Sequence, residues 1–480
     1  MTKKVRVRFA PSPTGMLHIG GVRAALFNYL FAKHHGGTFV LRIEDTDQER
    51  FFEGAVEQIV ESLSWLGITP DEGYWNGNHM GKHGPYVQSQ RLEQYHKAAH
   101  ELVQMGQAYY SRITPDEFEQ KKKAAIEAKQ PFVYCEEMEP ETDDRSTKGF
   151  PIRLKIPKGR TKWTDLVYGE FDVDNETVDD FVILKADGYP TYNFANVIDD
   201  HMMEISHVIR GPEFVPSTPK HAILYDLFKW DRPEFVHVPV ILGPDGKKKL
   251  SKRDGDVDVL SFAKQGFLPE AMVNFLVLLG WNDGTEQEFF SREELIEKFD
   301  VTRIQKSPAR FDLERLRWMN GHFLREGLSL DELVDKLNDY VPKEWLSDRE
   351  YFIQVVELDR ERFKTLADAH TLLEFFFVEP TYDVDIMKKL PSTDELIAWL
   401  EPAIQVIEDA SDQHDQLEKV LRDLAESLKI SPGKLFGALR VAITGRTEAP
   451  GIFDTILTVG RDRSVERIRR FLSVIRKYKT

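Results

Sequence analysis

The chain has 480 residues, of which 41% are hydrophobic and 30% charged, the composition of a soluble globular protein. This length exceeds what one ordinary core accommodates and predicts several domains. No apolar run approaches the ~20 residues of a membrane span, and the N-terminus leads directly into a predicted strand without room for a signal peptide. We therefore expect a cytoplasmic protein with no membrane partner.

The formal net charge of -16 argues against nonspecific binding to nucleic acid, although a nucleic-acid site needs only a local basic surface. Basic residues cluster at 121–123, at 247–253 and from residue 461 onward. Helices with such charges are usually just solvated, so these clusters permit a nucleic-acid partner without establishing one. Cys135 is the only cysteine, which excludes an intrachain disulfide and a multi-cysteine zinc site. It lies among acidic residues, which indicates an inert thiol.

Residues 5–21, VRVRFAPSPTGMLHIGG, predict a strand over 5–9, a turn of prolines and glycine, and a helix that begins near His18. A helix N-terminus with glycines lets a phosphate approach unpaired backbone N–H groups. The turn has neither the GxGxxG nor the GxxxxGK[ST] pattern, so a dinucleotide fingerprint and a P-loop are excluded. The simpler alternative is that His18 only caps the helix.

A second strand is predicted over 39–43 and a second amphipathic helix over 54–66, which together indicate an α/β unit. Arg8 and Glu44 lie at the ends of the two strands, where doubly wound sheets bind ligands. Asp45 and Asp47 alternate like a calcium loop but lack its glycine and terminal ligand. We expect these two to be structural or to start a helix.

Residues 81–189 are more polar and predict helices over 88–106 and 114–129, an acidic loop at 136–144, and strands near 152–156 and 181–184. Further on, Tyr192 and Asn196 are four residues apart and share one face of a short helix, so both can reach one ligand. Core packing is the simpler interpretation of Tyr192. Arg210 closes an otherwise apolar strand, where a merely structural arginine is uncommon.

Residues 243–255, GPDGKKKLSKRDG, are either a solvated basic loop or a phosphate-binding segment. Beyond residue 281 the pattern is helical, and from 325 onward the apolar stripes, such as Leu417, Leu421 and Leu424, indicate an all-α region with its own core.

Several segments resemble class I aminoacyl-tRNA synthetases of the bacterial glutamyl type. Residues 11–21 resemble the HIGH signature in its HIGG form, and KLSKR at 249–253 resembles the KMSKS loop, in the expected order. RIEDTD at 42–47 and residues 187–211 resemble the glutamyl active-site blocks. LRWMNGHF at 316–323 resembles the family's junction helix.

The resemblance implies a multi-domain fold: a Rossmann-like α/β catalytic domain with an inserted α+β domain, followed by an all-α C-terminal anticodon-binding region. The expected boundaries are 1–80 with 190–243 for the split catalytic domain, 81–189 for the acceptor-binding insertion, 244–322 for the loop and junction, and 323–480 for the anticodon region, with a break near 378.

The resemblance also implies roles for individual residues. The catalytic candidates are His18, Lys249 and Lys252. The ATP-binding candidates are Pro11, Ser12, Thr14, Gly15, His18, Gly20, Gly21, Lys252 and Arg253. The glutamate-binding candidates are Arg8, Ala10, Ser12, Glu44, Tyr192, Asn196 and Arg210, with Glu44 on the ammonium group. Arg362, within RERF at 360–363, is the candidate that reads the anticodon; a surface arginine is the alternative.

The implied activity is ligation of L-glutamate to tRNA(Glu) in two steps, with ATP and Mg²⁺ and without zinc, by a monomer. Arginine suits recognition of the side-chain carboxylate because of its bidentate fork, but the sequence leaves open whether Arg8 or Arg210 meets it. The alternatives are a nondiscriminating enzyme that also charges tRNA(Gln) and an inactive tRNA-binding paralogue. A small-molecule nucleotidyltransferase or a shorter tRNA-modifying paralogue would not explain the long helical tail.

Overall fold

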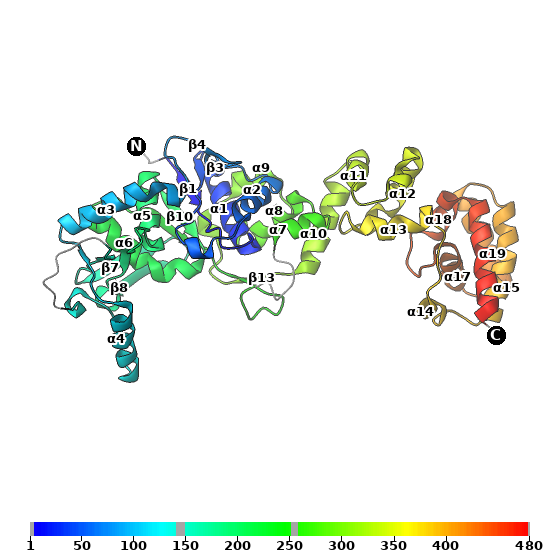
Figure 1. The fold of residues 1–480 in the computed structure, drawn as a ribbon. Helices are drawn as coiled ribbons and strands as arrows, with labels where there is room; N and C mark the ends of the chain where they lie inside the picture. The colour runs from blue at the N-terminus through cyan, green and yellow to red at the C-terminus, as the bar shows by residue number, and fades with distance from the viewer. Residues whose placement is uncertain (1–3, 141–148, 251–257, 479–480) are drawn as a thin grey trace. The chain divides into compact units, whose positions relative to one another are not determined.

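The computed structural model describes residues 4–140, 149–250 and 258–478. Its contacts divide the chain into two compact units, Met1–Ala263 with Pro269–Leu313, and Lys264–Leu268 with Glu314–Thr480 (Figure 1). Each unit is described by itself below. The finer division into four parts stays a prediction.

The first unit is built on a parallel sheet assembled from two distant parts of the chain. Strands β1, β2 and β3 pair in parallel, and β10 pairs in parallel with β11. β1 lies beside β10, where the backbone N–H of Ser206 donates to the carbonyl of Arg6 at 2.9 Å. The predicted α/β catalytic fold is therefore confirmed. The bounds are β1 (Arg6–Phe9), β2 (Thr38–Leu41), β3 (Glu72–Trp75), antiparallel β4 (Asn78–Met80), β10 (His207–Arg210) and β11 (Glu234–His237).

The strands β1 and β2 are buried on both faces rather than on one. All four residues of β1 and all four of β2 are buried, which is typical of parallel sheets covered by helices. Helix α1 (Ile19–His34) packs on β1, β2 and β10, and α8 (Pro269–Leu278) and α9 (Arg292–Lys298) pack on α1. The other helices of this part are α2 (Ala55–Trp65), α5 (Tyr192–Met202), α6 (Thr218–Leu227) and α7 (Val259–Lys264).

The segment between the two halves of the sheet has its own three-stranded antiparallel sheet and a hairpin. The hairpin strand β7 also pairs in parallel with β11, with Asp165 beside Phe235. The inserted segment thereby extends the catalytic sheet, which no local pattern predicted. Its elements are α3 (Leu92–Gln104), β5 (Ala108–Tyr110), α4 (Pro115–Glu127), β6 (Ile152–Leu154), β7 (Arg160–Asp165), β8 (Gly169–Asp174) and β9 (Val182–Leu184); β12 (Ile241–Leu242) and β13 (Ala309–Arg310) pair further on.

The second unit is helical, as predicted. Leu417 and Leu421 of the apolar stripe are fully buried in its core. Within the described part of the chain, no helix is both long and apolar enough to cross a membrane. The helices are α10 (Leu313–Glu326), α11 (Leu330–Leu337), α12 (Arg349–Asp359), α13 (Asp368–Phe377), α14 (Val384–Met387), α15 (Thr393–Asp409), α16 (His414–Ser427), α17 (Pro432–Thr444), α18 (Ile452–Val459) and α19 (Arg461–Tyr478).

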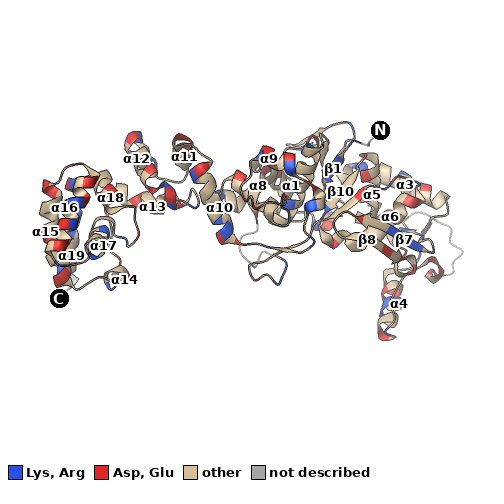
Figure 2. Ribbon diagram, turned by 180° about the vertical axis from the view of Figure 1, so that it is seen from behind, with Lys and Arg blue, Asp and Glu red and all other residues tan. Residues whose placement is uncertain are grey.

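Arginines of α19 form ion pairs with acidic residues from other parts of this unit. Glu379 pairs with three of them, and Arg467 among these is fully buried. The remaining pairs are Arg461 with Asp412, Arg469 with Glu408, and Arg476 with Glu401. Both signs of charge are interleaved along the helices of the chain, as α4 also shows (Figure 2). The basic cluster near the C-terminus is therefore mainly a structural network rather than an unpaired basic face.

The half-buried His207 on β10 should make the protein sensitive to acid. Burial, with the nearby His35, lowers its pKa to about 4, against about 6.5 in an unfolded chain. As the pH falls, His207 in the folded state binds a proton at a lower pH than it does in the unfolded chain. The neutral ring therefore contributes its full stabilisation of the fold above pH 6.5, and this contribution is lost as the pH falls through 4.

We expect His207→Asn to reduce the stability lost between pH 7 and pH 4 by about 2 kcal/mol relative to wild type. Denaturant titrations at the two pH values measure this loss. His414→Asn is the control, because that ring is 41% exposed. An equal loss in wild type and His207→Asn would contradict the assignment.

Candidate active site

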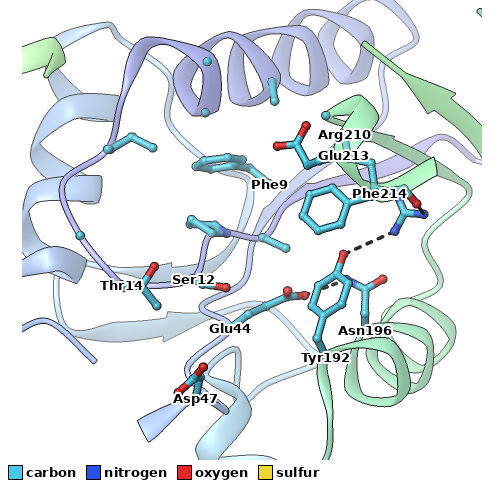
Figure 3. A pocket seen from close by; sticks show the side chains of 18 of the residues that line it. Phe9, Ser12, Thr14, Glu44, Asp47, Tyr192, Asn196, Arg210, Glu213 and Phe214 are labelled. Carbon is cyan, nitrogen blue, oxygen red and sulfur yellow. Dashed lines mark hydrogen bonds between the residues drawn. The ribbon is translucent and has the colours of Figure 1, made fainter. Parts of the chain in front are cut away.

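One cavity of about 1160 Å³ lies at the carboxyl ends of β1, β2 and β10 (Figure 3). Parallel sheets bind ligands at this edge. The cavity brings together all described members of the three predicted sets, although the distances along the sequence exceed 200 residues. They are Arg8, Ala10, Pro11, Ser12, Thr14, Gly15, His18, Gly20, Gly21, Glu44, Tyr192, Asn196, Arg210 and Lys249. Lys252 and Arg253 lie outside the described residues.

The N-terminus of α1 forms one wall of the cavity. His18 is the N-cap residue, and its Nδ1 accepts a hydrogen bond from the backbone N–H of Gly20 at 3.0 Å. The predicted helix start is confirmed, and His18 caps the helix; its role toward ATP stays a prediction. Because Nδ1 accepts, the proton of the neutral ring is on Nε2. A Cβ at residue 20 would lie 2.9 Å from the His18 ring, so this tight approach requires glycine.

Glu44 accepts hydrogen bonds from a buried arginine and from a side-chain amide. Its Oε1 accepts from Arg42 Nη2 at 2.8 Å and from Asn196 Nδ2 at 2.9 Å. The Oδ1 of Asn196 is buried and has no hydrogen-bond partner among the described residues. Burial raises the pKa of Glu44 although Arg42 opposes the shift. A carboxylate and an unsatisfied carbonyl oxygen together suit an ammonium group.

Asp200 joins the two arginines on this side of the site. Its Oδ1 accepts from Arg8 Nε at 3.0 Å and from Arg42 Nη1 at 2.7 Å, and all three side chains are nearly inaccessible to solvent. Burial acts to raise the pKa of Asp200, but the charges of Arg8 and Arg42 outweigh it and lower the pKa. Arg8 therefore faces the cavity with its charge already compensated by a carboxylate.

Arg210 faces the same cavity without such compensation. Its hydrogen-bond partners are all neutral groups: His237 Nε2 at 3.0 Å, Thr218 Oγ1 at 3.0 Å, His221 Nδ1 at 3.2 Å, the carbonyl of Phe214 at 3.4 Å and the hydroxyl of Tyr192 at 3.5 Å. Burial lowers the pKa of Arg210. A buried guanidinium without a carboxylate partner is a favourable place for an anionic group of a ligand.

Tyr192 lies between this arginine and the open cavity. Its ring stacks on Phe214 with centroids 5.2 Å apart, and burial raises the pKa of its hydroxyl to about 12. Figure 3 shows Glu44, Asn196 and Tyr192 on the side of the cavity opposite Phe9. The hydroxyl is a neutral hydrogen-bonding group here, so Tyr192 both packs and lines the site.

Lys249 enters the lining from the basic segment. Its Nζ lies 3.6 Å from Glu213 Oε1, and both side chains are about half exposed. The pairing is loose, so the ammonium group can change partners when a phosphate binds.

Sequence reasoning missed the residues behind the lining. Arg42, Asp200 and His237 each hold a predicted ligand-binding side chain, and we assigned none of them a role. The sequence signal was weak, since Asp200 is one of two adjacent aspartates on α5. The expectation for Asp47 is confirmed, because its side chain caps the short 3₁₀ turn Gln48–Arg50.

Arg362 lies in the second unit. Its Nη1 donates to Asp359 at 2.9 and 3.2 Å, its Nη2 donates to the carbonyl of Glu448 at 3.4 Å, and its side chain is 28% exposed. Asp359 is fully buried, and its carboxylate fixes the orientation of the Arg362 guanidinium. The arginine is therefore oriented rather than freely mobile, and its role remains a prediction.

Comparison with known families agrees with this architecture. The family described as tRNA synthetases class I (E and Q), catalytic domain, matches residues 4–318, and the family described as anticodon binding domain matches residues 332–472. The first match covers more than half of the chain. The chain therefore belongs to the class I tRNA synthetases of the E and Q type.

Within that class, similar proteins are named glutamate–tRNA ligases. One from Chloroflexus aurantiacus is 44% identical over 98% of both chains, and one from Dehalococcoides mccartyi is 44% identical over 98% of this chain and 97% of its own. A crystal structure of a glutamate tRNA ligase from Elizabethkingia meningosepticum, described as in complex with its amino acid, matches with a TM-score of 0.87 and 35% identity over 98% of this chain and 100% of the other. The resemblance seen in the sequence is confirmed.

Proposed function

We propose that this protein ligates L-glutamate to tRNA(Glu) in two steps, discriminates against tRNA(Gln), and acts as a cytoplasmic monomer. Glutamate first attacks the α-phosphate of ATP, which gives glutamyl-adenylate and pyrophosphate. A ribose hydroxyl of the tRNA 3′ end then takes the glutamyl group and releases AMP. The full-length similarity to glutamate–tRNA ligases supports the reaction class.

The observation that carries the choice of glutamate is the charge balance of the buried cluster beside the cavity. Four guanidiniums, of Arg8, Arg42, Arg91 and Arg210, accompany three carboxylates, of Glu44, Asp199 and Asp200, which leaves one net positive charge. Zwitterionic glutamate carries one net negative charge, whereas glutamine is neutral. Binding of glutamate therefore completes the balance.

The same balance assigns the two arginines. Arg8 is already paired with Asp200, so its remaining N–H groups suit the α-carboxylate. Glutamate and glutamine both have this group, so it does not have to distinguish between them. Arg210 has only neutral partners, so it suits the side-chain carboxylate that distinguishes glutamate from glutamine. Glu44 and the Oδ1 of Asn196 then receive the ammonium group.

In the adenylation step these residues position and neutralise rather than react covalently. The N-terminus of α1, Gly20, Gly21 and the Nε2–H of His18 are directed to the phosphates, where developing negative charge is stabilised by preorganised donors. ATP enters as its Mg²⁺ complex, so the metal is part of that substrate. Pro11, Ser12, Thr14 and Gly15 complete the proposed ATP contacts.

The test is exchange of pyrophosphate into ATP with glutamate, with and without tRNA(Glu), followed by charging of tRNA(Glu) transcripts. We expect exchange only when tRNA is present. Absence of exchange under both conditions would favour the inactive paralogue and overturn the proposal.

Lys252→Ala should slow adenylate formation by about a hundredfold while glutamate binding stays near the wild-type value, because the lysine acts on charge that develops on the phosphates. Single-turnover kinetics and glutamate titration measure the two effects. Lys247→Ala, an exposed lysine of the same segment, is the control. Equal losses in rate and in binding would contradict this role.

Arg362→Gln should raise the charging of tRNA(Gln) relative to tRNA(Glu) by about tenfold, an effect of ~1.4 kcal/mol. Competition between the two transcripts measures the ratio. Arg349→Gln is the matched control, because Arg349 forms an exposed ion pair with Asp335 in the same unit. If wild type already charges tRNA(Gln) efficiently, the nondiscriminating alternative holds.

A further inference from the structure

Two histidines hold Arg210 from behind, and both must present a lone pair to it. Arg210 Nε lies 3.0 Å from His237 Nε2, and Arg210 Nη1 lies 3.2 Å from His221 Nδ1. An arginine has donors only, so each of these ring nitrogens must be an acceptor. The proton of each neutral ring therefore has to be on the nitrogen that faces away from Arg210.

Asp165 satisfies this requirement for His237. Its Oδ2 lies 2.6 Å from His237 Nδ1 and also accepts from the backbone N–H of His237 at 3.1 Å. Its Oδ1 accepts from the backbone N–H groups of Val167 and Tyr168. Asp165 is 1% exposed and His237 is fully buried. The carboxylate can only accept, so it keeps the proton on Nδ1 and leaves Nε2 for Arg210.

Asn193 does the same for His221. The Nε2 of His221 lies 3.1 Å from Asn193 Oδ1, and this ring is 2% exposed. An amide oxygen accepts, so the proton stays on Nε2 and Nδ1 is free to accept from Arg210. The two rings thus reach opposite tautomers, each one set by an acceptor on its far side.

Both rings stay uncharged. Burial, with the positive charge of Arg210, lowers the pKa of His221 well below its usual value, and burial also lowers the pKa of His237 although Asp165 opposes the shift. Arg8, by contrast, is held at the corresponding Nε by the carboxylate of Asp200. The two arginines of the site are thus oriented in the same way but by partners of different charge.

We propose that His237 and His221, with tautomers set by Asp165 and Asn193, are positioning residues that hold Arg210 through neutral acceptors and so keep its full charge for the substrate. The identity of that substrate group, the glutamate side-chain carboxylate, rests on the proposed function. Asp165 belongs to β7 in the inserted segment, so the pairing of β7 with β11 brings this segment into substrate selection.

Asp165→Asn tests the arrangement with minimal change of shape. The amide keeps an oxygen for Val167 and Tyr168 but turns its NH2 group toward His237 Nδ1, and the backbone N–H of His237 loses its acceptor. The ring proton must then move to Nε2, where it opposes the N–H of Arg210. In the full chain with tRNA(Glu), we expect the KM for glutamate to rise about ten- to a hundredfold, with the KM for ATP within about twofold of wild type.

The matched control is Asp172→Asn on the adjacent strand β8, where the aspartate is 42% exposed and pairs with Arg160. His237→Gln keeps an acceptor toward Arg210, whereas His237→Leu removes it, so the KM for glutamate should be lower in the glutamine variant. An unchanged KM for glutamate in Asp165→Asn, or a parallel rise of the two KM values, would overturn the proposal.

The tautomers give a readout that does not depend on activity. In protein labelled with ¹⁵N-histidine, long-range ¹H–¹⁵N spectra distinguish protonated from unprotonated ring nitrogens, and the signals that disappear in His237→Gln identify that ring. We expect a protonated Nδ1 in wild type and a protonated Nε2 in Asp165→Asn. A protonated Nε2 in wild type would overturn the proposal even if exchange is active. Wild type without glutamate-dependent exchange but with the expected tautomers would instead count against the proposed function alone.

Discussion

Arg210→Gln should lower kcat/KM for glutamate by about thirtyfold to several thousandfold, because the substrate carboxylate loses a buried charged partner whose removal costs about 2–5 kcal/mol. The KM for ATP should change little, because the proposed site of the phosphates is the N-terminus of α1. Glutamine should become a relatively better substrate, since the variant cavity has lost the charge that rejects it. Exchange kinetics with the two amino acids measure both effects.

Arg210→Lys provides a graded comparison. It retains the charge but loses the planar fork, so it should recover only part of the activity. Arg232→Gln is the matched control, because Arg232 forms its ion pair with Asp226 and does not line the cavity. If Arg210→Gln leaves the preference for glutamate over glutamine intact, Arg210 does not read the side-chain carboxylate.

Arg42→Met should destabilise the first unit by about 3–5 kcal/mol, because it leaves Glu44 and Asp200 buried without the guanidinium between them. The corresponding fall in Tm is about 10 °C. Thermal and urea denaturation measure the loss of stability. Because the chain has two compact units, the unfolding transition of the first unit has to be followed separately.

The pH dependence of that loss checks its cause. Without Arg42 the two carboxylates should have raised pKa values in the folded state and should take up protons as the pH falls. Protonation removes the uncompensated charge, so the difference from wild type should be smaller at pH 5 than at pH 8. Arg50→Met is the control, since that side chain is 76% exposed and its pair with Asp47 contributes little. A difference that does not vary with pH would indicate lost packing rather than unpaired charge.

The elements around the cavity could be predicted where the local pattern is strong. The start of α1 at His18, the strand that ends at Arg210 and the shared helix face of Tyr192 and Asn196 agree with the structure. Each depends on residues within one or two turns of one another, where periodicity and breakers carry the information. The pairing of the hairpin strand β7 with β11 was missed, because β11 lies about 70 residues further along the chain.

By itself, the sequence determined the strand and helix at the start of the chain, the all-helical second unit and the residue types available for an anionic amino acid and a nucleotide. Only the tertiary structure decided how the charges are paired: Asp200 compensates Arg8, whereas Arg210 meets two neutral histidines. The physical reason is that pairing depends on distance and burial among side chains from separate strands, which local pattern does not encode. Two arginines that are equivalent as residue types thereby become different as binding groups.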